Sequence, residues 1–153
     1  MTALLEARGL AAGYDGHAIV RDLDLTVAPG EVVALLGPNG AGKSTTMLTL
    51  AGDLPSLGGE VELLGEVTTQ ALHRRARRGL GFVTEERSVL MGLTVRENLR
   101  LGRADTGMTL QLFPELERLM GRRCGLLSGG EQQIVTLARA LARRPRCTSP
   151  RDR

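Results

Sequence analysis

A glycine-rich loop, placed between an apolar run and a helical pattern, limits this chain to few folds. Residues 37–45 read GPNGAGKST and fit the pattern G-x-x-x-x-G-K-[ST] at every fixed position. The preceding run 32–36, VVALL, predicts a strand buried on both faces, because strands inside a parallel sheet are continuously apolar. A helix is expected from Lys43 to about Ala51. This order of strand, loop and helix favours an α/β fold over a chance glycine turn.

The residue types of the loop suit a phosphate group. Gly37, Gly40 and Gly42 let the backbone curl so that several N–H groups point at one place. The N-terminal end of the following helix adds partial positive charge. Lys43, the only lysine of the chain, is expected to reach the β- and γ-phosphates of a nucleotide, and the Ser44 hydroxyl is expected to ligate Mg²⁺. The predicted nucleotide-binding residues are Gly37, Asn39, Gly40, Ala41, Gly42, Lys43, Ser44 and Thr45.

Composition removes several classes of function. The 153 residues are 42% hydrophobic and 24% charged, which is enough for one packed domain or part of one. The net charge of +3 and the three aromatic residues argue against a nucleic-acid partner. Cys124 and Cys147 lack metal-ligand spacing, which favours a reduced, intracellular chain. The sequence has neither a signal-peptide pattern nor an apolar run near the ~20 residues of a membrane span.

The first half of the chain alternates between strand and turn signals. Residues 4–10 and 23–27 predict half-buried strands, and short apolar strands are expected at 61–64 and 80–83. A basic surface helix is expected over 69–78. Its arginines either form a solvated face, which the pattern favours, or bind phosphates. They are Arg74, Arg75, Arg77 and Arg78.

Helical signals dominate the second half. Capping boxes at 94–97 and 128–131 open helices that are expected to reach about residues 101 and 143. A further helix is expected over 114–120. In the last helix, apolar residues at i, i+3, i+4 and i+7 predict one buried face. They are Ile134, Leu137, Ala138 and Leu141.

The segment 127–133, LSGGEQQ, reduces the number of P-loop families to which the chain could belong. Together with the loop at 37–45 it resembles the nucleotide-binding subunits of ABC transporters, whose signature is LSGGQ or a close variant; Glu131 stands at the consensus Gln. Ser128 caps a helix whose glycine-bordered N-terminus is open to an anion. The resemblance implies that this end faces the γ-phosphate held by the other subunit of a dimer. The implied contact residues are Ser128, Gly129, Gly130, Glu131 and Gln132.

A closer similarity extends over residues 4–146. The stretches GLTVRENLRLG at 92–102 and LFPEL at 112–116, with the two motifs above, are similar to the smaller ATPase of branched-chain amino acid importers. The resemblance implies an ATP-binding subunit that energises branched-chain amino acid uptake, with ATP and Mg²⁺ as cofactors. It also implies a second ATPase subunit, in a homodimer or heterodimer, and membrane permease subunits as partners. The implied location is cytoplasmic, peripheral on the inner face of the plasma membrane. A soluble P-loop kinase is disfavoured because the signature has no role there.

Two further positions follow from the resemblance. Tyr14 matches the aromatic residue that stacks on adenine; a core or turn tyrosine is the alternative. Residues 83–85 read Val-Thr-Glu where the family reads Val-Pro-Gln, so Glu85 stands at the Q-loop position. A glutamate there offers an oxygen to Mg²⁺ or its water but adds negative charge near the phosphates. Altered coupling between nucleotide and transporter is therefore expected.

The family pattern beyond the signature helix has no match after Arg146. An apolar strand ending in Asp-Glu, a D-loop and a switch His are expected there, but residues 147–153 read CTSPRDR. His17 and His73 both precede the signature, so no residue is assigned a catalytic role. The missing strand would lie beside 32–36, which is expected to present an unpaired, apolar edge. A frameshift or premature stop is the expected cause of this ending, with a naturally short regulatory protein as the alternative.

The expected architecture is therefore an incomplete ABC ATPase core of the P-loop α/β class, with an antiparallel β part and a helical subdomain. Residues 1–86 would hold the β part and the P-loop core, 87–143 the helical segment with the signature helix, and 144–153 an aberrant tail. Such a chain is expected to be inactive in ATP hydrolysis on its own. The alternative function is a nucleotide-binding or interaction module that hydrolyses nothing.

Overall fold

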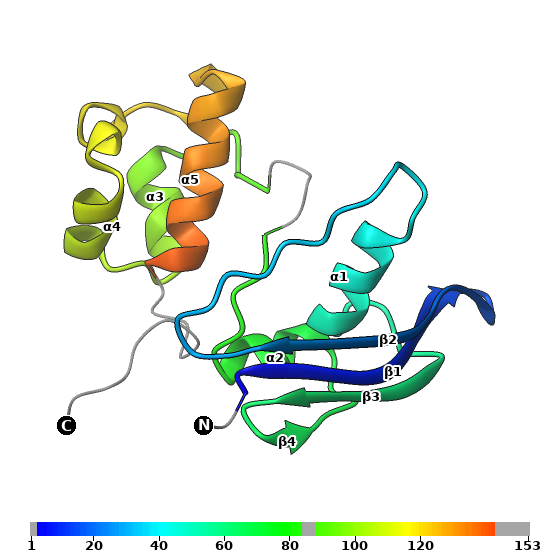
Figure 1. Cartoon of the computed structure of the whole chain (residues 1–153). Helices are drawn as coiled ribbons and strands as arrows, with labels where there is room; N and C mark the ends of the chain where they lie inside the picture. The colour runs from blue at the N-terminus through cyan, green and yellow to red at the C-terminus, as the bar shows by residue number, and fades with distance from the viewer. Residues whose placement is uncertain (1–2, 84–87, 143–153) are drawn as a thin grey trace. The chain divides into compact units, whose positions relative to one another are not determined.

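The structure, a computed structural model, describes residues 3–83 and 88–142 (Figure 1). The chain divides into two compact units, one ending at Leu80 and the other beginning at Gly81. The first unit is built around a β-sheet, whereas the described elements of the second are helices.

A four-stranded antiparallel sheet forms the first unit, in the order β2-β1-β3-β4. β1 (Leu5–Tyr14) and β2 (His17–Val27) form a hairpin, β3 (Gly58–Leu63) pairs with the other edge of β1, and β4 (Glu66–Val67) pairs with β3. The strands expected at 4–10, 23–27 and 61–64 are thus confirmed, although the first two are longer than predicted.

The β1–β2 hairpin is closed by the dipeptide Asp15-Gly16. Tyr14 pairs with His17, and the two residues between them have positive φ angles of 49° and 77°. Asp-Gly is a preferred sequence for a two-residue turn of this hand, because its twist matches that of the strands. The turn explains why β1 continues to Tyr14 instead of ending near residue 10.

Two helices complete the first unit. α1 (Lys43–Ala51) packs on the sheet, where buried Leu50 joins Ala7, Leu10 and Val61 in one hydrophobic cluster (Figure 1). This confirms the helix expected after the P-loop. α2 (Leu72–Arg77) is shorter than the predicted helix over 69–78.

The strand predicted at 32–36 is wrong. Residues 31–38 have no regular secondary structure, and Val32 and Leu36 are 94% and 91% exposed. A strand is stabilised by backbone hydrogen bonds to a neighbour, and no strand in the described part of the chain pairs with this run. The strand predicted at 80–83 is also wrong for the same reason, since its residues are irregular.

The prediction of a solvated face for the arginines at 74–78 fails at Arg75. Arg74 and Arg77 are exposed, while Arg78 is half-buried and forms an ion pair of 2.8 Å with Glu66. Arg75, in contrast, is only 5% exposed. A guanidinium is buried at low cost only where its donors are satisfied, and tertiary neighbours supply the acceptors here.

The second unit is a small helical body. Its helices are α3 (Val95–Leu101), α4 (Thr106–Leu112) and α5 (Gly129–Leu141), with 3₁₀ turns η1 (Pro114–Leu119) and η2 (Cys124–Leu126). Both predicted capping boxes are present, at the starts of α3 and α5. The helix expected over 114–120 is a 3₁₀ helix instead. α4 was not predicted, although Asp105 caps it by accepting a hydrogen bond of 2.9 Å from the N–H of Met108.

The buried face of α5 differs from the predicted one. Leu141 is 38% exposed, and Ile134 and Leu137 are only partly buried, whereas Ala138 is buried as expected. The face that packs inside the unit is displaced around the helix because α3 and the 124–127 turn lie on that side. The residues buried along α5 are Gln132, Val135, Thr136 and Ala138.

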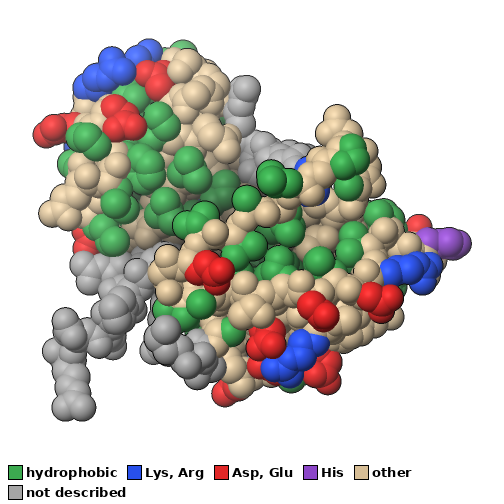
Figure 2. Space-filling view, viewed as in Figure 1, with side chains coloured by type: hydrophobic (Ala, Val, Ile, Leu, Met, Phe, Trp, Pro, Cys, Tyr) green, Lys and Arg blue, Asp and Glu red, His purple; other side chains and the backbone are tan. Residues whose placement is uncertain are grey.

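Hydrophobic side chains remain at the surface of the helical unit (Figure 2). Among the described residues of this unit, the exposed large ones are Leu90, Met91, Leu101, Leu112, Leu126 and Leu141. No helix in residues 3–83 and 88–142 is long and apolar enough to cross a membrane.

Candidate nucleotide-binding site

The loop 37–45 takes a backbone path that its glycines allow. Gly40 and Gly42 have φ angles of 84° and 87°, in the left-handed region that side chains other than glycine rarely adopt. A Cβ on Gly42 would also overlap the side chain of Val20. The glycine at this position is therefore required by conformation and by packing against β2.

Lys43 reaches back across the loop. Its Nζ donates hydrogen bonds of 2.8 Å to the carbonyl oxygen of Gly37 and of 2.8 Å to that of Pro38. In the described part of the chain no carboxylate lies within ion-pair distance of this ammonium. The carbonyl oxygens thus hold a positive charge at the loop without neutralising it, which suits an anionic ligand.

Hydrogen bonds from Thr46 stabilise the start of α1. The N–H and Oγ1 of Thr46 donate to the carbonyl oxygen of Gly42 at 2.8 and 2.9 Å. Thr45 is 6% exposed, so its side chain serves the interior of the unit, whereas Asn39, Ala41 and Ser44 are exposed. Of the predicted P-loop residues, Thr45 is thus buried, Gly42 and Lys43 are half-buried, and the others are exposed to solvent.

The two other predicted nucleotide contacts have different outcomes. Tyr14 is the last residue of β1 and is 46% exposed, so it is not a core tyrosine. It belongs to the same unit as the P-loop. Glu85, the predicted Q-loop position and tentative Mg²⁺ ligand, lies outside the described residues.

Mg²⁺ fits the donors of this site. The ion keeps several waters and binds through one or two protein groups together with phosphate oxygens. No group of three or more His, Cys, Asp or Glu side chains suited to a metal occurs among residues 3–83 and 88–142. A single hydroxyl such as that of Ser44, completed by phosphates, agrees with this mode of binding.

The signature segment opens α5 through reciprocal hydrogen bonds. The N–H of Ser128 donates to Glu131 Oε2 at 2.8 Å, and the N–H of Glu131 donates to Ser128 Oγ at 3.3 Å. These bonds hold the pKa of the Glu131 carboxyl below its usual value, the backbone bond from Ser128 being the main cause. Ser128 and Gly130 are exposed, so the N-terminus of α5 is open at the surface of its unit.

Gln132 does not share this exposure. It was predicted to face a nucleotide with the rest of the signature, but it is 6% exposed. Its Nε2 donates to the carbonyl oxygens of Cys124 and Leu127 at 3.0 and 3.2 Å. The side chain therefore lies inside the helical unit, because its position on α5 turns it toward the 124–127 turn.

Asn98 is a buried polar residue that the sequence analysis missed. It is 0% exposed and lies on the inward face of α3 with Val95 and Leu99. The i, i+3, i+4 spacing of these three residues was the available signal, since it puts an amide on an otherwise apolar stripe.

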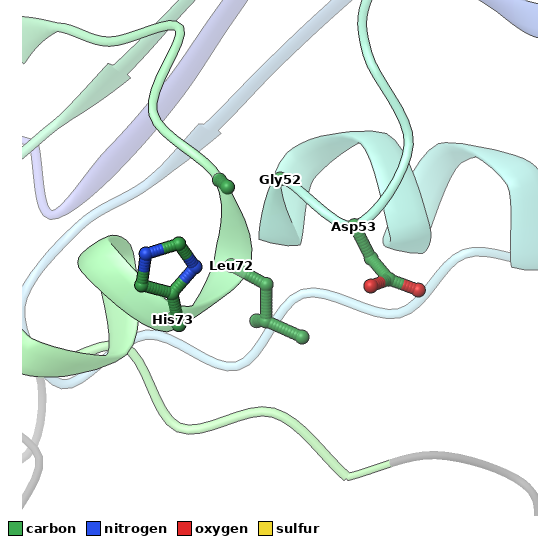
Figure 3. A pocket seen from close by; sticks show the side chains of 5 residues that line it. Gly52, Asp53, Leu72 and His73 are labelled. Atoms are coloured by element: carbon green, nitrogen blue, oxygen red, sulfur yellow. The ribbon is translucent and has the colours of Figure 1, made fainter.

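A shallow pocket in the first unit lies apart from these motifs in sequence. It has a volume of about 410 Å³ and is lined by Gly52, Asp53, Ala71, Leu72 and His73 (Figure 3). The Leu72 side chain lies between the Asp53 carboxylate and the His73 ring in this view. The two polar groups do not converge, so the pocket offers no chemistry of its own.

The family follows from a direct match. The sequence model of the ABC transporter family matches residues 20–148, so the chain belongs to this family. The chain is similar to the lipopolysaccharide export system ATP-binding protein LptB of Escherichia coli K12, at 38% identity over 94% of the chain and 65% of that protein. It is 40% identical to a probable ABC transporter ATP-binding protein of Azorhizobium caulinodans, over 92% of the chain and 54% of that protein. The chain thus spans about two thirds or less of these relatives.

Solved structures agree on the fold. An ATP-binding subunit of an ABC transporter superimposes with a TM-score of 0.79 at 30% identity, over 93% of this chain and 63% of the other. The ATP-binding cassette MJ0796, described as dimeric and bound to ADP and Pi, gives 0.79 at 27%, over 92% and 70%. MJ1267 gives 0.81 at 23%, over 95% and 67%, which supports the fold alone. The predicted α/β fold of an ABC ATPase core is confirmed.

Proposed function

We propose that this chain is the ATP-binding part of an ABC transporter and binds Mg²⁺-ATP at residues 37–45. The observation that carries this proposal is the Lys43 ammonium, held by two backbone carbonyl oxygens at 2.8 Å beside an exposed glycine loop. Phosphates would replace these carbonyl oxygens as partners of Nζ and accept hydrogen bonds from the loop N–H groups. Ser44 would contribute a hydroxyl to Mg²⁺, and Glu85 is proposed as a second oxygen ligand.

Tyr14 is proposed to stack on the adenine. The support is its exposed position at the end of β1, in the unit that also carries the P-loop. An aromatic ring that is open on one face offers stacking to any purine, so this contact would add affinity without strong base selectivity.

The signature is proposed to act on a nucleotide held by a second ATPase subunit. Ser128, Gly129 and Gly130 lie at the N-terminus of α5, where unpaired N–H groups and the helix dipole attract an anion. Glu131 supports this end through its capping bonds. A relative described as dimeric is consistent with this arrangement, and the same proposal makes membrane permease subunits the remaining partners.

A second candidate function is nucleotide binding or partner interaction without hydrolysis. Water-orienting or general-base groups contribute roughly 10²–10⁴-fold to such reactions, and no such role is assigned to a residue of the two motifs at 37–45 and 127–133.

Two transported solutes follow from the resemblances. The motif pattern favours branched-chain amino acids taken up from outside, whereas the relatives named LptB favour lipopolysaccharide moved outward. In either case the chain would work on the cytoplasmic face of the membrane, bound to its permease. Deletion of the gene separates the two: lost uptake of radiolabelled leucine supports import, and lipopolysaccharide retained in the inner membrane supports export.

The nucleotide proposal is tested by titration with a fluorescent ATP analogue. The wild-type chain should bind it in the presence of Mg²⁺, and Lys43→Ala should lose most of the affinity because it removes the charge at the loop. Arg74→Ala, an exposed cation on α2, is the matched control and should bind as the wild type does. Equal affinity of wild type and Lys43→Ala would contradict the proposal.

A further inference from the structure

An amide in α3 fastens the segment 88–93 to the helical unit. Asn98 Oδ1 accepts a hydrogen bond of 2.9 Å from the N–H of Leu90, and Nδ2 donates to the Leu90 carbonyl oxygen at 3.0 Å. Nδ2 also lies 3.1 Å from the carbonyl oxygen of Thr94 and 3.1 Å from Cys124 Sγ. Asn98 is therefore paired with Leu90 in the manner of a β-bridge, from within the core.

A second amide fastens the same segment to the turn before the signature. Gln132 Nε2 donates to the carbonyl oxygens of Cys124 and Leu127, and it lies 3.7 Å from Met91 Sδ. Leu127 is the residue immediately before Ser128. The turn that carries the N-cap of α5 is thus held by an amide that also touches the segment 88–93.

Backbone hydrogen bonds complete the connection. The N–H of Cys124 donates to the Leu93 carbonyl oxygen at 2.8 Å, and the N–H of Gly125 donates to that of Met91 at 3.0 Å. Cys124 contacts both amides: its sulfur accepts a hydrogen bond from Asn98, and its carbonyl oxygen accepts one from Gln132. The segment 88–93 and the turn 124–127 therefore form one hydrogen-bonded body.

Stability alone does not account for Gln132. Its Oε1 is buried, and no group in the described part of the chain donates a hydrogen bond to it. A flipped amide would set this oxygen against two carbonyl oxygens, so the orientation is fixed. A buried acceptor without a donor is costly, and a methionine of similar volume would avoid that cost. A methionine could not, however, donate the two hydrogen bonds that the Gln132 amide makes to the carbonyl oxygens of the 124–127 turn.

We propose that Asn98 and Gln132 are positioning residues that fix Ser128 to the segment 88–93, so that a displacement of this segment is passed to the N-terminus of α5. The inference rests on the proposed role of Ser128 as an anion contact. It adds a connection by which the position of 88–93 sets that of the signature within the same subunit.

Amide hydrogen exchange of the full chain without nucleotide tests the proposal. Asn98→Leu should raise exchange in the peptide 127–133, which Asn98 does not contact, about five- to tenfold, as expected for the loss of a buried hydrogen bond. Gln132→Met should raise exchange of the Leu90 N–H, which is bonded to Asn98 and not to Gln132, by a similar factor. The control is Thr109→Val, which removes the hydroxyl of another fully buried polar side chain, in α4. This variant should melt at a temperature comparable to that of the two test variants but leave the exchange of both peptides unchanged.

Two results would overturn the inference. One is faster exchange that stays local to the substituted side, and the other is an equal rise of both peptides in Thr109→Val. If Asn98→Leu does not fold, the response of the Leu90 N–H to Gln132→Met decides alone. ATP binding is measured separately and is expected to be unchanged in Asn98→Leu. A wild-type chain that fails to bind ATP refutes the proposed function, while the exchange data still decide this inference.

Discussion

The guanidinium of Arg75 donates a hydrogen bond of 2.7 Å to the carbonyl oxygen of Leu50, in the last turn of α1. The same group donates to the carbonyl oxygens of Gln70 at 2.7 Å and Thr68 at 3.2 Å. Its positive charge lies at the C-terminal, partially negative end of the P-loop helix. Burial lowers the pKa of Arg75, so the position depends on these acceptors, not on contact with solvent.

Replacing Arg75 should therefore destabilise the first unit. Arg75→Met keeps much of the apolar stem but leaves the carbonyl oxygens without donors, and we expect a loss of about 2–4 kcal/mol in the free energy of unfolding. Urea unfolding followed by circular dichroism measures it. Arg74→Met is the control on the exposed side of α2 and should stay within about 0.5 kcal/mol of the wild type. Similar losses in both variants would contradict the role of Arg75.

Gly42→Ala should damage the P-loop more than Gly40→Ala does. Both positions have φ near 85°, but only at Gly42 would the added Cβ overlap Val20. We expect about 1 kcal/mol for the backbone strain at either position and a further loss at Gly42 from displacement of β2 or the loop. Thermal unfolding and ATP titration of the two variants check this order, and equal effects would show that the contact with Val20 does not matter.

Exposure of the run 32–36 is directly testable. Because Val32 and Leu36 are almost fully exposed, Val32→Ser and Leu36→Ser should change the free energy of unfolding by less than about 0.5 kcal/mol. They should also reduce the fluorescence of a dye that binds exposed apolar surface. Leu10→Ser, at a fully buried position in β1, should by contrast destabilise strongly. A large loss for Val32→Ser would restore the buried strand that the sequence suggested.

The capping carboxylate of α5 gives a pH-dependent contribution to stability. The pKa of Glu131 is lowered in the folded chain, so its contribution is present above the unfolded value of about 4.3 and is lost as the pH falls through the folded pKa. Glu131→Gln should lower the unfolding midpoint relative to the wild type at pH 7, and the difference should shrink at pH 3. Glu117→Gln, at an exposed position in η1, is the control. A difference that persists unchanged at pH 3 would contradict the assignment.

Features of the chain whose hydrogen-bond partners lie within a few residues were determined by the sequence itself. The capping boxes at 94–97 and 128–131 and the glycine loop before α1 are of this kind, because each is formed by neighbours along the backbone. The alternation in β1 and β2 likewise predicted strands. These local signals were also those that carried the family resemblance.

The tertiary structure decided every position whose partners lie far away in sequence. The run 32–36 reads as a buried strand, but pairing needs a neighbour, and no described strand provides one. Arg75 reads as a solvated cation, yet the end of α1, 25 residues away, supplies its acceptor. Asn98 and Gln132 read as ordinary polar residues, and only the packing of α3 and α5 around the 124–127 turn buries them. A side chain's environment depends on which distant segments fold against it, and residue type and spacing alone do not contain that information.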